Sequence, residues 1–223
     1  MNDIKKIKGP IREPVSGKKP KQLVIFCHGL GSDGNDLIEL APYFAKTLPE
    51  AMFISPNAPF PFDLGPSGYQ WFPLENSTPE SRLIGVREAS PIINQFIDEK
   101  LELLGLKENQ LALVGFSQGA MLALHIGLRR ETPIAGIIGY SGSLIGEGLL
   151  QNEVVSSPPI LLVHGDRDEV VPPDSLQNSI DALNKVGIEV SGELRPGLGH
   201  SLDDHGIMLG MDFLRRCFGV PLG

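Results

Sequence analysis

The chain has 223 residues, of which 41% are hydrophobic and 21% are charged, as is usual for one soluble globular domain. Its formal net charge of −8 argues against a nucleic acid as partner, because phosphate backbones are bound by basic surfaces. With only two cysteines, Cys27 and Cys217, the sequence does not have the pattern of a disulfide framework, and no residues have the spacing of metal ligands.

The first 21 residues differ from the rest of the chain in charge. Their basic side chains are Lys5, Lys6, Lys8, Arg12, Lys18, Lys19 and Lys21. We expect residues 1–21 to form an edge strand or a flexible arm before a domain at 22–223, with a basic membrane-surface patch as the alternative. There is no apolar core of a secretory signal and no stretch near the ~20 apolar residues of a membrane helix. The sequence therefore favours a cytoplasmic protein without stable membrane insertion.

The rest of the chain alternates short apolar runs with longer helical patterns. The runs predict strands at 22–27, 51–55, 110–116, 133–140, 159–164 and 188–194. Helical patterns cover 36–47, 80–104, 118–129, 173–185 and 203–218. This alternation predicts an α/β fold with a mostly parallel central sheet and helices on both faces. Two long loops, 56–79 and 141–157, are candidates for the walls of a substrate site.

A glycine-rich segment, HGLGSDGND at 28–36, follows the first of these strands. Such a loop presents backbone N–H groups that bind anions. It lacks the GK[ST] ending of a phosphate loop and the G-x-G-x-x-G pattern of a dinucleotide site. The other interpretation is an oxyanion loop, in which the N–H of Leu30 is the candidate donor.

The sequence G-F-S-Q-G at 115–119 lies between a predicted strand and a predicted helix. The G-x-S-x-G pattern is weak alone, but in this context it is typical of the nucleophile elbow of an α/β-hydrolase. Ser117 is then the nucleophile, and the N–H of Gln118 is the first oxyanion donor. A plain structural turn is the alternative.

An acid and a base should follow the nucleophile in that order. Three carboxylates compete after the strand at 159–164, namely Asp166, Asp168 and Glu169. Spacing favours Asp168 only modestly, while Asp166 suits a role in bracing the turn. For the base, a glycine-rich loop before the last helix favours His200. The other histidines are better explained as turn or helix residues: His28, His125, His164 and His205.

Four motifs together resemble the phospholipase/carboxylesterase family, which includes the acyl-protein thioesterases: HGLGSDGND, GFSQGAMLAL, HGDRDEVVP and GLGH. The resemblance covers about residues 22–218. It implies an α/β-hydrolase fold without a large lid domain, no cofactor or metal, and often a homodimer. It also places the catalytic acid on Asp168 and the oxyanion donors on Leu30 and Gln118.

The implied function is a serine hydrolase that cleaves short- to medium-chain carboxylic esters through an acyl-enzyme. Acyl-protein thioesterase or lysophospholipase activity is the alternative, so the expected partner is a small acyl ester or thioester. The segment Q-W-F-P at 70–73 departs from the S-W-F-D typical of the thioesterases and is more similar to bacterial carboxylesterases. Trp71 and Phe72 either line the acyl pocket or anchor their loop to the core. A serine peptidase and a catalytically inactive binding protein of the same fold are remote alternatives.

Overall fold

The computed structural model describes residues 5–74 and 78–221. Its strands are β1 Ile11–Arg12, β2 Gln22–Cys27, β3 Ala51–Ile54, β4 Phe60–Pro61, β5 Tyr69–Gln70, β6 Leu111–Phe116, β7 Gly136–Tyr140, β8 Ile160–Gly165 and β9 Val190–Arg195. Its α-helices are α1 Gly34–Leu37, α2 Ala41–Phe44, α3 Pro79–Leu104, α4 Gln118–Gly127, α5 Leu150–Glu153, α6 Asp174–Lys185 and α7 Asp204–Cys217. Single 3₁₀ turns occupy Ile38–Leu40, Glu108–Gln110 and Glu147–Leu149.

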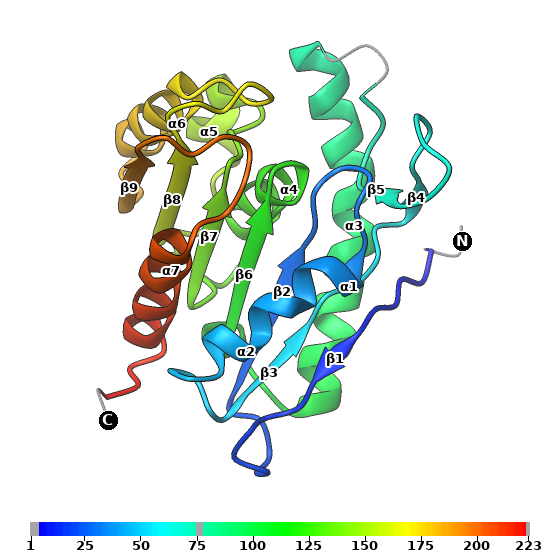
Figure 1. Ribbon diagram of the computed structural model, residues 1–223, viewed down its shortest axis with the longest axis vertical. Coiled ribbons are helices and arrows are strands. Elements are labelled where there is room, and N and C mark those ends of the chain that lie inside the picture. Colours follow the sequence, from blue (N-terminus) through cyan, green and yellow to red (C-terminus); the bar gives the residue numbers. More distant parts are fainter. Residues whose placement is uncertain (1–4, 75–77, 222–223) are drawn as a thin grey trace.

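Within the described residues, one seven-stranded sheet has the order β1-β3-β2-β6-β7-β8-β9 (Figure 1). The strands from β3 to β9 in this order are parallel, and β1 pairs antiparallel with β3 at one edge. After β2 the chain moves to β3 on one side of it and then to β6 on the other. This reversal makes the carboxyl ends of β2 and β6 a switch point, where open α/β sheets leave room for a ligand.

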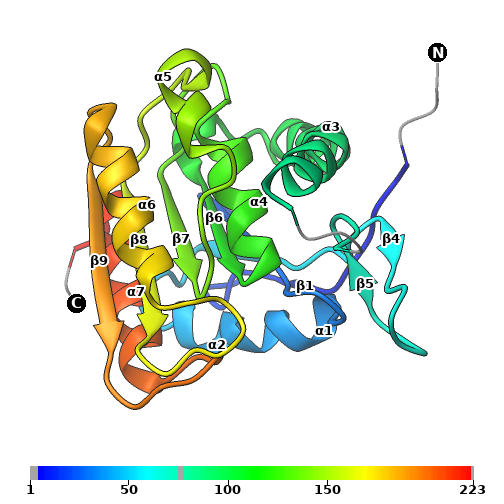
Figure 2. The ribbon, with the colours of Figure 1, turned by 90° about the horizontal axis from the view of Figure 1, so that it is seen from above.

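Each face of the sheet carries its own apolar core, and Figure 2 shows helices on both sides. Side chains alternate along β2, so that Leu23 and Ile25 pack toward α3, α4 and α6, whereas Val24 and Phe26 pack toward α2 and α7. Burial on both faces explains why these strands read as continuous apolar runs. The predicted mostly parallel sheet with helices on both faces is confirmed.

The elements of the structure differ from the predicted ones in three places. The helix expected at 36–47 is divided into α1, a 3₁₀ turn and α2, and Pro42 lies at the start of α2. The antiparallel pair β4–β5 lies inside the predicted loop at 56–79, and α5 lies inside the predicted loop at 141–157. Among the described helices, none is long and apolar enough to span a membrane.

Candidate active site

The loop between β6 and α4 holds Ser117 in a backbone conformation that non-glycine residues rarely adopt, with φ 53° and ψ −118°. The flanking glycines permit this turn. A Cβ atom on Gly119 would lie 1.9 Å from the carbonyl oxygen of Cys27, and one on Gly115 would lie 2.3 Å from that of Gly119. Ser117 is 8% exposed, and its N–H donates to the carbonyl of Tyr140 at 2.8 Å. The elbow is therefore closely packed between two strands.

His200 lies on the loop between β9 and α7, which passes over the carboxyl ends of the central strands (Figure 1). Its Nε2 atom lies 2.9 Å from the Oγ atom of Ser117, and its Nδ1 atom lies 2.8 Å from Oδ2 of Asp168. A carboxylate only accepts, so Nδ1 carries the proton and Nε2 of the neutral ring can accept the serine proton. The ring also packs against Phe116, with centroids 4.9 Å apart.

The side chain of Asp168 is fully buried, but all of its contacts favour the carboxylate. Burial raises the pKa of this carboxyl, whereas the hydrogen bonds from His200, Val171 and Val170 lower it. The hydrogen bonds dominate, and the net pKa is below its usual range. Nε2 of His164 lies 3.2 Å from Oδ2 and 3.0 Å from the carbonyl of Val171. Asp168 is thus held as an oriented anion.

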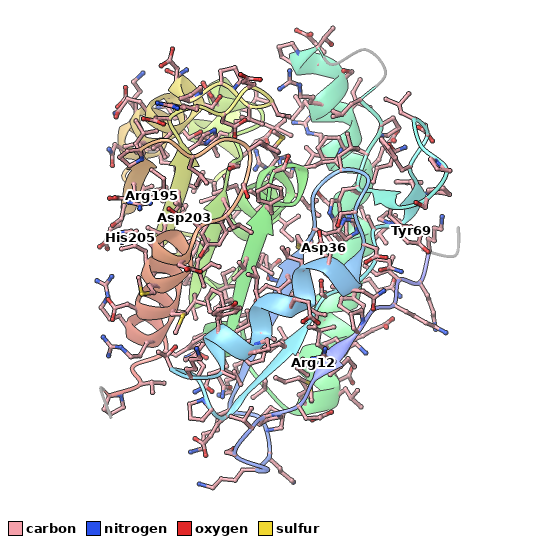
Figure 3. All side chains as sticks on the ribbon, viewed as in Figure 1. Arg12, Asp36, Tyr69, Arg195, Asp203 and His205 are labelled. Carbon is pink, nitrogen blue, oxygen red and sulfur yellow. The ribbon has the colours of Figure 1, made fainter. Side chains whose placement is uncertain are left out.

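Among the described residues, no hydrogen bond or ion pair joins Asp166 to His200. Its Oδ1 atom accepts from the N–H of Gly197 at 2.7 Å, so it braces the loop that carries the histidine. The same loop is closed by an ion pair between Arg195 and Asp203, with Nε and Oδ2 3.0 Å apart, and these two residues lie close together in Figure 3. The structure brings Ser117, Asp168 and His200 together and leaves Asp166 outside the group.

Of the other histidines, His164 contacts Asp168 through Nε2, and the remaining three have other surroundings. His28 is buried, donates from Nδ1 to the carbonyl of Gly29 and accepts at Nε2 from the N–H of Ala58. His125 is buried within α4, and His205 lies in the first turn of α7. Among the described residues, no cluster of three or more His, Cys, Asp or Glu side chains is arranged to hold a metal ion.

The two candidate oxyanion donors lie on either side of Ser117. The N–H of Gln118 belongs to the first turn of α4, where no preceding helical carbonyl is available to it. The loop that carries Leu30 approaches the nucleophile from β2: a Cβ atom on Gly29 would lie 3.5 Å from Cβ of Ser117. Within the described part of the chain, no hydrogen bond occupies the N–H of Leu30.

Trp71 and Phe72 are both fully buried in the core. Nε1 of Trp71 donates to the carbonyl of His28 at 2.9 Å. Because these side chains have no exposed surface, the structure favours the interpretation that they anchor their loop to the core over the one that they line the acyl pocket. Sequence reasoning missed the side chain of Gln118, which bonds to the backbone of Trp71 and Phe72.

Comparisons with known proteins identify the family of the chain. The phospholipase/carboxylesterase family model matches residues 13–218. The chain is 28% identical to the esterase YpfH of Escherichia coli K12, over 89% of this chain and 84% of that esterase. It is 30% identical to acyl-protein thioesterase 1 homolog 1 of Dictyostelium discoideum, over 86% and 89%. The crystal structure of esterase PE8 superposes with a TM-score of 0.91 at 40% identity, covering 95% of this chain and 99% of that one.

A match over nearly the whole chain, with the elbow and its hydrogen-bonded partners in place, settles the family. The chain belongs to the phospholipase/carboxylesterase family of α/β-hydrolases.

Proposed function

We propose that this protein is a serine hydrolase that cleaves carboxylic esters of short- to medium-chain acyl groups through an acyl-enzyme intermediate. The observation that carries the proposal is the continuous chain of hydrogen bonds from Oγ of Ser117 through His200 to Asp168. In this assignment Ser117 is the nucleophile, His200 the general base and Asp168 the residue that orients the base.

The proposed reaction has two halves. Nε2 of His200 takes the hydroxyl proton as Oγ of Ser117 forms a bond to the ester carbonyl carbon, and the carbonyl oxygen becomes an oxyanion. The imidazolium then gives that proton to the departing alkoxide, which leaves the acyl group on Ser117. Water, deprotonated by the same ring, adds to the acyl-enzyme, and collapse of the second oxyanion releases the acid and restores the serine hydroxyl.

The backbone N–H groups of Leu30 and Gln118 are proposed as the donors to each oxyanion. Gln118 begins α4, so the positive end of the helix dipole also favours negative charge at this point. Such donors act mainly in the transition state, where the oxygen carries its full charge.

A cleft beside the segment that follows β7 is the proposed place for the substrate. It has a volume of about 440 Å³ and is lined by Ser143. The residue before Ser143 is Gly142, on which a Cβ atom would lie 3.2 Å from the carbonyl oxygen of Ser117. Its lining is part apolar, with Leu144 and Ile145, and part polar, with Ser175 and Asn178. The volume suits a ligand of modest size. In this proposal the loop at 141–157 supplies one wall of the substrate site.

Thioester cleavage remains the second candidate, because the relatives include proteins named acyl-protein thioesterases. The same acyl-enzyme would form, with a thiolate as the leaving group. Cleavage of lysophospholipids also stays a proposal. The same holds for a cytoplasmic location, for a homodimer and for the division of the chain into a segment at 1–21 and a domain at 22–223.

Replacement of Ser117 by Ala tests the proposal. We expect hydrolysis of p-nitrophenyl esters to fall by roughly 10³-fold or more while the fold is retained, because the variant lacks the hydroxyl that Nε2 of His200 contacts. A panel of p-nitrophenyl esters of graded chain length, measured beside matching acyl-thioesters, identifies the preferred leaving group. Turnover by the variant within tenfold of the wild type would refute the assignment.

A further inference from the structure

The side chain of Gln118 points away from solvent and uses both ends of its amide. The residue is 2% exposed. Its Oε1 atom accepts from the backbone N–H of Trp71 at 2.8 Å, and its Nε2 atom donates to the backbone carbonyl of Phe72 at 2.7 Å. Because the first partner can only donate and the second can only accept, they determine the orientation of the amide. The residue after the nucleophile is thereby joined to the segment at 69–72, here called the bridging segment.

The bridging segment is joined on its other side to the loop that carries Leu30. Tyr69, labelled in Figure 3, donates from its N–H to the carbonyl of Ser32 at 2.8 Å and accepts from the N–H of Gly31 at 2.9 Å. Nε1 of Trp71 donates to the carbonyl of His28 at 2.9 Å. These bonds hold the loop on both sides of Leu30 and leave the N–H of Leu30 itself to the site.

The close packing of this region leaves little room for adjustment. A Cβ atom on Gly68 would lie 2.0 Å from the carbonyl oxygen of Gly31, so the two backbones are in direct contact. Trp71 and Phe72 are fully buried. Any movement of the bridging segment would therefore move the loop of Leu30 relative to α4.

We infer that the side chain of Gln118 is a positioning group that sets the distance between the two oxyanion donors, its own N–H and that of Leu30. Through the bridging segment it connects the elbow to the loop after β2. The inference rests on the proposed function, since it assumes that these two N–H groups bind the oxyanion. Oxyanion donors bind only within a narrow range of distance from the oxygen. A shift of one donor relative to the other therefore reduces stabilisation of the transition state more than binding of the ester.

Replacement of Gln118 by Met tests the inference, because Met keeps similar volume and the backbone N–H but loses both amide bonds. We expect kcat for a p-nitrophenyl ester to fall by about 10- to 100-fold with KM within about twofold. The inhibition constant of a trifluoromethyl ketone with the same acyl chain, which forms a tetrahedral oxyanion on Ser117, should rise by the same factor as kcat/KM falls. The pH at half-maximal kcat/KM should not move, since the contacts of His200 are untouched.

Gln110 offers a matched control. Its side chain also accepts from one backbone N–H, that of Lys107, and donates to one backbone carbonyl, that of Lys21, but at the opposite end of β6. Gln110→Met should leave kcat and the inhibition constant within about twofold of the wild type. If Gln118→Met does not fold, Gln118→Glu keeps the bond from Trp71 and loses the one to Phe72. It should show the same parallel losses in kcat/KM and in inhibitor affinity.

Three results would overturn the inference: wild-type kcat in the folded Gln118 variant, a fall in kcat/KM without the matching rise in the inhibition constant, or a displaced pH profile. The last would place the damage at His200 instead. Ser117→Ala separates this failure from that of the proposed function. If Ser117→Ala abolishes turnover and Gln118→Met does not reduce it, only the positioning role is refuted.

Discussion

At the scale of single residues, the backbone of Ser117 has an unfavourable positive φ of 53°. Holding a non-glycine residue in an unfavourable conformation costs on the order of 1–3 kcal/mol. The surrounding structure imposes this conformation through the hydrogen bond from the N–H of Ser117 to the carbonyl of Tyr140. Gly115 and Gly119, which have no side chains, allow the close approach of the neighbouring backbone. The strain exposes Oγ to His200, so part of the stability of the fold is used to place the nucleophile.

The residues of the candidate triad could be chosen from the sequence, but for unequal reasons. Ser117 was marked by its motif, and His200 by a glycine-rich loop before the last helix. The choice between Asp166 and Asp168 needed the family resemblance, because both lie in one turn and spacing hardly separates them. In the structure the two side chains diverge, one to His200 and the other to the N–H of Gly197.

We predict opposite outcomes for the two aspartates. Asp168→Asn should lower kcat by about 10³- to 10⁴-fold, because an amide N–H facing Nδ1 favours the wrong tautomer of His200. Asp166→Asn keeps an oxygen for the N–H of Gly197, so kcat should stay near the wild-type value, with any change confined to stability. Steady-state kinetics and urea unfolding of both variants provide the measurement. The reverse pattern would mean that the acid has been assigned to the wrong residue.

At the scale of elements, the apolar strands and the longest helix were predicted well, whereas the helix at 36–47 and the strands inside the loop at 56–79 were not. The expected limits of β2 agree with the structure, and α3 begins one residue before the predicted helix. The strands β4 and β5 have two residues each, too few for any periodicity to be visible. The bonds of Gln118 to the bridging segment join residues 47 and 46 positions apart, so no local pattern could indicate them.

The contact between the end of β8 and the loop of His200 provides a test at this scale. A Cβ atom on Gly165 would lie 2.2 Å from the carbonyl oxygen of Leu198 and 2.5 Å from that of Gly199. Gly165→Ala should therefore displace the loop, lower the free energy of unfolding by about 1–3 kcal/mol and reduce kcat/KM by roughly 10²-fold. Unfolding curves and ester kinetics measure both effects.

Gly148 is the matched control for the stability measurement alone, because a Cβ atom there meets no atom within 4 Å but the residue lines the proposed substrate cleft. Gly148→Ala should change the free energy of unfolding by no more than about 0.5 kcal/mol. Full activity in the folded Gly165 variant would show that the position of His200 does not depend on this contact.

At the scale of the whole molecule, the fold followed from the alternation of apolar runs and helical patterns, since a sheet buried on both faces requires a helix after most strands. The alternation could not show which polar groups the two cores enclose. His125 is one of these. It lies in α4 with 3% of its surface exposed, and its Nδ1 atom has no partner among the described residues.

His125 should make the protein less stable in acid. Burial lowers the pKa of His125 to about 4, helped by Arg129 and Arg87 and opposed by Glu153. His125 therefore binds a proton below about pH 6.5 in the unfolded chain but only below about pH 4 in the folded chain. As the pH falls across this window, the free energy of unfolding falls by about 3 kcal/mol. The contribution is fully present above pH 6.5 and is lost as the pH falls.

Replacement of His125 by Leu, of similar volume and without a titrating group, should remove this dependence. Urea unfolding at pH 7.5 and pH 4 measures the free energy of both proteins. The wild type should lose about 3 kcal/mol more than His125→Leu between the two values. His28, whose pKa is also lowered by burial, is present in both proteins, so its contribution cancels in the comparison. Equal losses in the two proteins would show that another group governs stability in acid. Because Arg129 bonds to the backbone carbonyl of residue 125, that contact survives the substitution and does not confuse the result.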